Sequence, residues 1–178
     1  SAVVRRVRSA CAESSCGLMA MAASRPVADI GTAPITLQEV LKLHGYLIHF
    51  ILGGDHTNFY GLKEMYGAVD SFHDGSGQGV RYINDDQLVL DRVRALPPAK
   101  SGQAVAFQFH LMSTHGLGQR DPSLSPFVPA ENYYGWPGPS PRRPPSGDTA
   151  RAGVNYYDNG MVRFDNMASR ILDELKEE

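Results

Sequence analysis

The 178-residue sequence has few cysteines, little net charge and no long hydrophobic run. Its two cysteines, Cys11 and Cys16, are five positions apart, a spacing that fits neither a zinc knuckle nor a redox CxxC pair. A net charge of −2 gives no overall field typical of a nucleic-acid binder. No apolar run reaches the roughly 18–20 residues that span a bilayer, and no signal peptide is visible. We therefore expect the chain as it stands to be soluble and cut from a larger protein, with its compartment left open by the cysteine count.

The residues that are present predict helices separated by buried strands. A composition of 42% hydrophobic and 20% charged residues is ordinary for a globular domain. Thr36 and Glu39 have the spacing of a helix capping box, and Gly45 ends that helix. Asp85 and Asp86 mark the start of another helix, which ends before two prolines. Helices are predicted at residues 12–24, 36–45, 85–98 and 153–178, and a loop with a short helix at residues 55–67.

The last helix is predicted to be long and amphipathic, because apolar residues recur at spacings of three and four. They are Val154, Tyr157, Met161, Phe164, Met167, Ile171 and Leu175.

Two continuous apolar runs, 46–54 and 104–111, predict buried strands of the kind found in parallel sheets. Alternation of strands and helices predicts an α/β fold with a mostly parallel sheet flanked by helices. Residues 1–8 are a candidate third strand. The sheet is short for the number of helices, which again indicates an incomplete domain.

Residues 116–150 form a proline-rich loop inside this single domain of residues 1–178. Eight of the twelve prolines fall between Pro122 and Pro145, and the stretch "WPGPSPRRPPSG" within the loop cannot form a helix or an inner strand. A loop of this length in a compact domain is typically a functional lid or a disordered excursion.

Candidate site residues follow the two predicted strands. If the strands are parallel, both following loops open at the same edge, which brings Asp55, His56, Tyr60 and His115 near one another. The alternative interpretation is that His115 is a surface loop residue and Asp55 a turn former.

A further candidate precedes the first helix, where free N–H groups lower a thiol pKa and receive an anion. Cys11 occupies this place, and Ser9 and Ser14 compete with it for the role of nucleophile. Ordinary N-capping by serine is the alternative.

The segment "HLMSTHG", a proline-bearing loop and "NYYDNGMVRFDNMASRILDELK" follow one another in the chain. In this order they resemble the sulfatase-like branch of the alkaline phosphatase superfamily, especially its membrane-anchored phosphoethanolamine and phosphoglycerol transferases and lipoteichoic acid synthase. The segments "TLQEVLKLHGYLIHFILGGD" and "FYGLKEMYG" are similar to the same family. Leu117 stands where that family has proline, and Leu62 where the phosphoglycerol transferases have arginine. The resemblance implies an alkaline phosphatase-like core truncated at both ends.

The resemblance also implies roles for single residues. His115 takes the place of a catalytic histidine that contacts the transferred phosphate or sulfate. Cys11 takes the place of the nucleophile, which is also a metal ligand. Asp55 and Tyr60 take the places of substrate-binding residues.

The implied parent is a metal-dependent phosphotransferase or sulfuric-ester hydrolase with Zn, Mn, Mg or Ca, anchored at the periplasmic face of the bacterial inner membrane. Its substrate would be a phospholipid, a glycan, or another phosphate or sulfate ester. Other metal ligands of the family would lie before Ser1 and after Glu178, so we expect the isolated chain to be inactive and to bind divalent metal weakly. The alternatives are a non-catalytic module of the same fold that recognises an anionic head group or glycan, and an unrelated α/β domain whose proline-rich loop docks a protein. Oligomeric state is left open.

Overall fold

The computed structural model describes residues 14–54, 61–67, 69–75, 84–132 and 147–176, and the statements below concern these residues. They divide into two compact units. Unit 1 contains the described parts of residues 1–50, 56–72 and 99–108, and unit 2 those of 51–55, 73–98 and 109–178.

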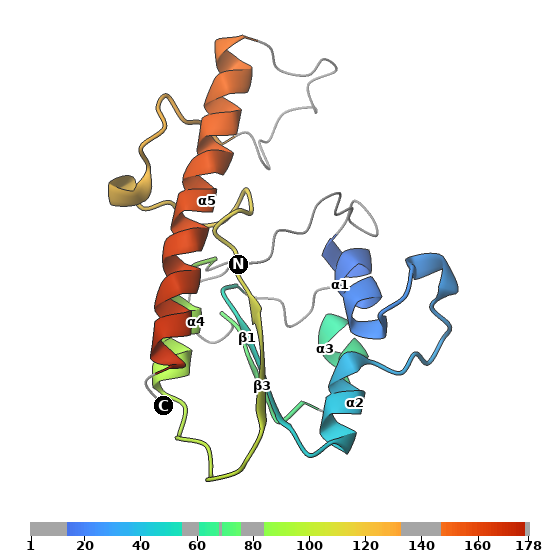
Figure 1. Ribbon diagram of the computed structural model, residues 1–178. Helices are drawn as coiled ribbons and strands as arrows, with labels where there is room; N and C mark the ends of the chain where they lie inside the picture. The colour runs from blue at the N-terminus through green and yellow to red at the C-terminus, as the bar shows by residue number, and fades with distance from the viewer. Residues whose placement is uncertain (1–13, 55–60, 68, 76–83, 133–146, 177–178) are drawn as a thin grey trace. The chain divides into compact units, whose positions relative to one another are not determined.

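The described strands form an open parallel sheet of three strands in the order β2-β1-β3, flanked by helices, which confirms the predicted α/β class. Strands β1 (Leu47–Leu52) and β3 (Val105–His110) lie within the two predicted apolar runs (Figure 1). The short strand β2 (Ser71–His73) was not predicted. The candidate third strand at residues 1–8 lies outside the described residues.

Unit 1 contains α1 (Ser14–Ala23), the 3-10 helix η1 (Val27–Asp29), α2 (Leu37–Leu43) and α3 (Leu62–Met65). The predicted capping box of α2 is present. The Thr36 hydroxyl accepts a hydrogen bond from the Glu39 N–H at 3.2 Å, and the Glu39 carboxylate accepts one from the Thr36 N–H at 2.7 Å. Gly45 follows the helix at a φ of +81°, a conformation that glycine adopts without strain.

The core of unit 1 includes the aromatic pair Phe50 and Tyr66, whose ring centroids are 4.2 Å apart. Phe72 of β2 stacks on the same Phe50 at 5.9 Å. Burial raises the pKa of Tyr66 to about 12, so this phenol stays neutral at physiological pH. Tyr66 directly follows α3, so the aromatic cluster packs the end of this helix against β1 and β2.

Removal of the Thr36 hydroxyl should show how much the capping box contributes to the free energy of unfolding. We expect Thr36→Ala to lower the free energy of unfolding by about 1 kcal/mol, the usual contribution of an N-cap side chain. Thr36→Ser keeps the accepting oxygen and serves as the control, with a smaller loss. Urea denaturation measures both, and equal losses in the two variants would show that the cap adds nothing beyond packing.

Asp70 fastens the start of β2 to β1. Its carboxylate accepts a hydrogen bond from the Ile48 N–H at 2.8 Å and pairs with the Lys42 ammonium group. The hydrogen bond from Lys42, helped by the one from Ile48, lowers the pKa of Asp70 below its ordinary value. Because the pKa is lower in the folded state, this contribution to stability is present above about pH 4 and is lost as the pH falls through the lowered value.

Replacement of Lys42 by methionine should raise the pKa of Asp70, because it removes the hydrogen bond and the charge that lower it. An NMR titration of the Asp70 carboxyl carbon measures the change. The matched control is Lys176→Met, which removes a lysine that pairs with Asp173 instead. A pKa of Asp70 that stays the same in Lys42→Met would contradict the assignment of its cause.

Unit 2 is built on α4 (Gln87–Arg94), the 3-10 helix η2 (Pro122–Leu124) and α5 (Asp148–Glu174). Helices α4 and α5 pack side by side (Figure 1). Arg94 and Glu174 form an ion pair between their C-terminal ends. The side chains that these two helices bury most completely are Val89, Leu90, Val93, Met167 and Ile171.

The structure confirms that α5 is a long helix but shows that much of its predicted apolar stripe is exposed. Val154 and Tyr157 are 58% and 52% exposed. Asn159 and Gly160 are buried instead, and they face the segment that follows β3. Among the described residues, no helix is both long enough and apolar enough to cross a bilayer.

Candidate functional site

The chain that leaves β3, Met112–Gly118, is called the β3 turn below, and a buried carboxylate holds its beginning. Asp86, which is 1% exposed, accepts hydrogen bonds from the Met112 N–H at 2.5 Å and the Ser113 N–H at 2.9 Å. The Ser113 hydroxyl donates to the same carboxylate. Asp86 directly precedes α4, so one side chain joins the start of this helix to the end of the strand.

The sequence predicted that Asp85 and Asp86 both mark the start of a helix, and Asp85 does so. Asp85 accepts a hydrogen bond from the Gln87 N–H at 3.0 Å and so caps the first turn of α4. Asp86 makes no such cap, because its carboxylate points to the β3 turn.

Three glycines allow main chain to approach the β3 turn closely. A Cβ added at Gly53, just after β1, would lie 2.3 Å from the Asp86 carboxylate. A Cβ at Gly118 would lie 1.9 Å from the carbonyl oxygen of Met112, and one at Gly160 in α5 would lie 2.5 Å from that of Ser113. A side chain at Gly118 or Gly160 would therefore collide with main chain, and one at Gly53 would displace the Asp86 carboxylate.

His115 lies at the tip of the β3 turn and is partly exposed. Its Nδ1 atom accepts a hydrogen bond from the Leu117 N–H at 3.1 Å. An imidazole nitrogen that accepts a hydrogen bond carries no proton, so the neutral ring has its proton on Nε2. In the neutral ring the N–H donor is therefore at Nε2.

The rest of the β3 turn is held by side chains from two other segments. The carbonyl oxygen of Gly116 accepts hydrogen bonds from the Asn132 side-chain amide at 2.6 Å and from the Tyr156 hydroxyl at 3.2 Å. The buried side chain of Asn159 donates to the Phe127 carbonyl oxygen and accepts from its N–H, at 2.9 and 3.0 Å. These contacts fix the turn and the chain after it against α5.

Most of the predicted site residues cannot be placed. Cys11, Asp55 and Tyr60 lie outside the described residues, as do Ser9 and His56, so their convergence with His115 stays a prediction. Ser14 is the first residue of α1, and Cys16, in the same helix, is disulfide-bonded. No three His, Cys, Asp or Glu side chains gather as metal ligands in the part of the chain that the structure describes.

Sequence reasoning missed the residues that shape the β3 turn. Asp86 was assigned to the helix start, and Arg120, Asn132 and Tyr156 drew no attention. The one available signal was Gly160, since an isolated glycine inside a helical pattern usually has a packing reason.

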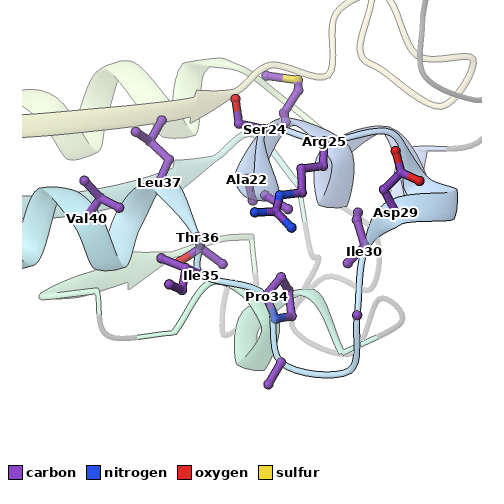
Figure 2. Close-up of a pocket in the computed structure, with 14 residues that line it drawn as sticks. Ala22, Ser24, Arg25, Asp29, Ile30, Pro34, Ile35, Thr36, Leu37 and Val40 are labelled. Carbon is purple, nitrogen blue, oxygen red and sulfur yellow. The ribbon is translucent and has the colours of Figure 1, made fainter.

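Two cavities are lined by described residues alone, and His115 is not among the residues that line them. In unit 1, a groove of about 650 Å³ lies between α1 and α2, with the Arg25 side chain among apolar residues such as Ile30 and Ile35 (Figure 2). In unit 2, a cavity of about 470 Å³ surrounds Arg163, which donates to Asp85 at 2.5 Å and lies 3.9 Å from Asp121.

Comparison of the chain with protein-family models, with curated proteins and with solved structures found no match. The functional conclusions below therefore depend on the residues and contacts of this chain.

Substitution of Gly160 by alanine should reverse the usual effect of this change in a helix. Alanine normally stabilises a helix by up to about 1 kcal/mol relative to glycine. Here the new methyl group would meet the Ser113 carbonyl oxygen, so we expect a loss of about 1–3 kcal/mol in the free energy of unfolding. The control is Gly17→Ala in α1, where nothing lies within 4 Å of the added Cβ and stabilisation is expected. Thermal unfolding measures both, and stabilisation by Gly160→Ala would contradict the close contact.

Proposed function

We propose that this chain is part of a sulfatase-like domain that acts on phosphate or sulfate esters, and that His115 donates a hydrogen bond to the anion. The observation that carries the proposal is the hydrogen bond from the Leu117 N–H to Nδ1, which leaves the proton on Nε2. The position of His115 supports it too, since ligands of parallel α/β sheets bind beyond the carboxyl ends of the strands.

The chemistry proposed for His115 is electrostatic. In transfer of a phosphoryl or sulfuryl group, negative charge on the non-bridging oxygens is stabilised by donors already in place. The Nε2–H group is such a donor, and the neutral ring keeps this proton while the ester is cleaved, because its loss would leave an imidazolate anion. The turn that carries the ring is fixed at both ends by hydrogen bonds, so little reorganisation is needed.

A divalent cation and the nucleophile belong to the proposal as predictions only. Cys11 remains the candidate for nucleophile and metal ligand, with Asp55 and Tyr60 as candidates for substrate binding. The described residues do not by themselves form a divalent-metal centre, so we propose no step that depends on a metal ion. A phospholipid, glycan or other ester substrate at the periplasmic face of a bacterial membrane stays part of the same proposal.

One observation favours the second candidate, a non-catalytic module that recognises an anionic head group or glycan. Cys16 is disulfide-bonded, and the other cysteine of the sequence is Cys11, so a disulfide within one chain would leave the candidate nucleophile without a thiolate. The Nε2–H donor of His115 suits recognition of an anion as well as its transfer. Recognition is therefore the function that we assign to the oxidised chain.

The test titrates the full chain with orthovanadate, phosphate and sulfate, and follows the His115 imidazole nitrogens by NMR. We expect shifts of Nε2 and a dissociation constant raised about tenfold to a hundredfold in His115→Ala, the usual loss for a hydrogen bond to a charged group. His115→Gln, which restores a donor near Nε2, should recover part of the affinity. His44→Ala is the control, because His44 is exposed at the end of α2.

Hydrolysis of a phosphodiester and of an aryl sulfate, each with and without a reductant, separates transfer from recognition. Turnover that appears only after reduction and disappears in His115→Ala supports the enzyme. Since the isolated chain is expected to be inactive even if its parent is an enzyme, binding without turnover supports the recognition module only when the full-length parent, assayed with divalent cations, also shows none. Unchanged affinity in His115→Ala, with no shift of its imidazole nitrogens, would contradict both.

A further inference from the structure

Arg120 makes several hydrogen bonds to the main chain of the β3 turn and its neighbours. Its guanidinium group donates to main-chain carbonyl oxygens only. The Nη1 atom lies 2.9 Å from the Gly118 oxygen and 3.4 Å from that of Gln119, and Nη2 lies 3.3 Å from the oxygen of His115 itself. The Nε atom donates to the Tyr156 oxygen in α5 at 3.1 Å. Among the described residues, no carboxylate forms an ion pair with Arg120.

The same side chain also stacks on the residue that holds the next peptide. The guanidinium carbon lies 4.0 Å from the centre of the Tyr156 ring, and the Tyr156 hydroxyl donates to the Gly116 oxygen at 3.2 Å. The stack and these hydrogen bonds together hold the carbonyl groups of His115, Gly116 and Gly118. The guanidinium group is planar and carries five N–H donors in a fixed geometry, so it can bind several main-chain carbonyl oxygens at once.

These contacts affect the His115 imidazole because the donor to its Nδ1 atom is the main-chain N–H of Leu117, only two residues away. The Leu117 N–H reaches Nδ1 only when the peptides of residues 115–117 keep their present orientation. Arg120 holds the carbonyl group of His115, in the peptide before that N–H, and Tyr156 holds the carbonyl group of Gly116, in the same peptide as that N–H. Burial lowers the pKa of Arg120, which shows that a charged group is kept partly desolvated at this place.

We propose that Arg120 is a positioning residue for His115, which keeps the proton on Nε2 by holding the main chain of the β3 turn. Arg120 acts through the peptide groups and does not touch the anion. This inference rests on the proposed function, which assigns anion binding to His115.

The test compares Arg120→Ala with Arg163→Ala in the full chain. Arg163 is also largely buried in unit 2, but it pairs with Asp85 and Asp121, and among the described residues it forms no hydrogen bond or ion pair with the β3 turn. Both variants should be less stable than the parent chain. Only Arg120→Ala should give a mixture of Nδ1–H and Nε2–H forms in the imidazole nitrogen spectrum, together with about tenfold weaker binding of orthovanadate, the loss expected for one misplaced hydrogen bond to an anion.

Rescue and a milder variant make the result independent of overall folding. Methylguanidinium ion at millimolar concentration should restore the Nε2–H form in Arg120→Ala, whereas Arg120→Lys should restore it only in part because an ammonium group lacks the fork. Tyr156→Phe keeps the ring under Arg120 and removes one hydrogen bond to Gly116, so it should shift the tautomer ratio in a stably folded chain. Leu117→Pro, which lacks the donating N–H, shows the spectrum of a ring without the Nδ1 bond.

The outcomes separate the two proposals. If Arg120→Ala and Tyr156→Phe keep the Nε2–H form and the parent affinity, Arg120 has a structural role only and the inference is wrong. If His115→Ala leaves the affinity unchanged, the proposed function fails, and the imidazole spectra still show whether Arg120 positions the ring.

Discussion

The hydrogen bonds to the Asp86 carboxylate determine where the chain goes after β3. A buried carboxylate is stable only when donors replace the water that it loses, and here two main-chain N–H groups and one hydroxyl do so. Because Gly53 presses against the same carboxylate, the end of β1, the start of α4 and the β3 turn share one contact point. His115 lies two residues beyond Ser113, so its position depends on a side chain that never approaches the imidazole.

The features that the sequence predicted correctly are the local ones. The continuous apolar runs predicted β1 and β3, and the spacing of Thr36 and Glu39 predicted the start of α2, because each signal lies within a few residues of the structure that it specifies. Strand β2 was missed since it has three residues and depends on Asp70, whose partner Ile48 is 22 positions away. No property of three residues can indicate a contact with a distant strand.

Helix α5 shows why the site was harder to predict than the fold. Apolar spacing identified the helix but not the side that packs, since the side facing the β3 turn contains an amide and a glycine. Asn159 is buried because both ends of its side chain pair with the main chain of Phe127, and Gly160 because a carbonyl oxygen occupies the space of a side chain. A ranking of helix faces by hydrophobicity cannot detect surfaces that complement main chain rather than apolar side chains. Of the four residues that the sequence assigned to the site, His115 alone falls in the described part of the chain, so their meeting at one edge stays a prediction.

The identity of residue 117 connects the resemblance to the geometry. If the chain belongs to the sulfatase-like family, as proposed, proline would be expected at this position, and proline has no N–H to donate. This chain has leucine, whose N–H reaches Nδ1 of His115 and selects the protonated nitrogen. With proline at this position, the tautomer of the histidine would have to be set by some other donor or by the ligand itself. In this chain the proton position of the imidazole therefore depends on the turn's own main chain, whose conformation depends on Arg120, Tyr156 and Asp86. A histidine at the end of a strand can be read from the sequence, but which of its nitrogens carries the proton follows only from these contacts.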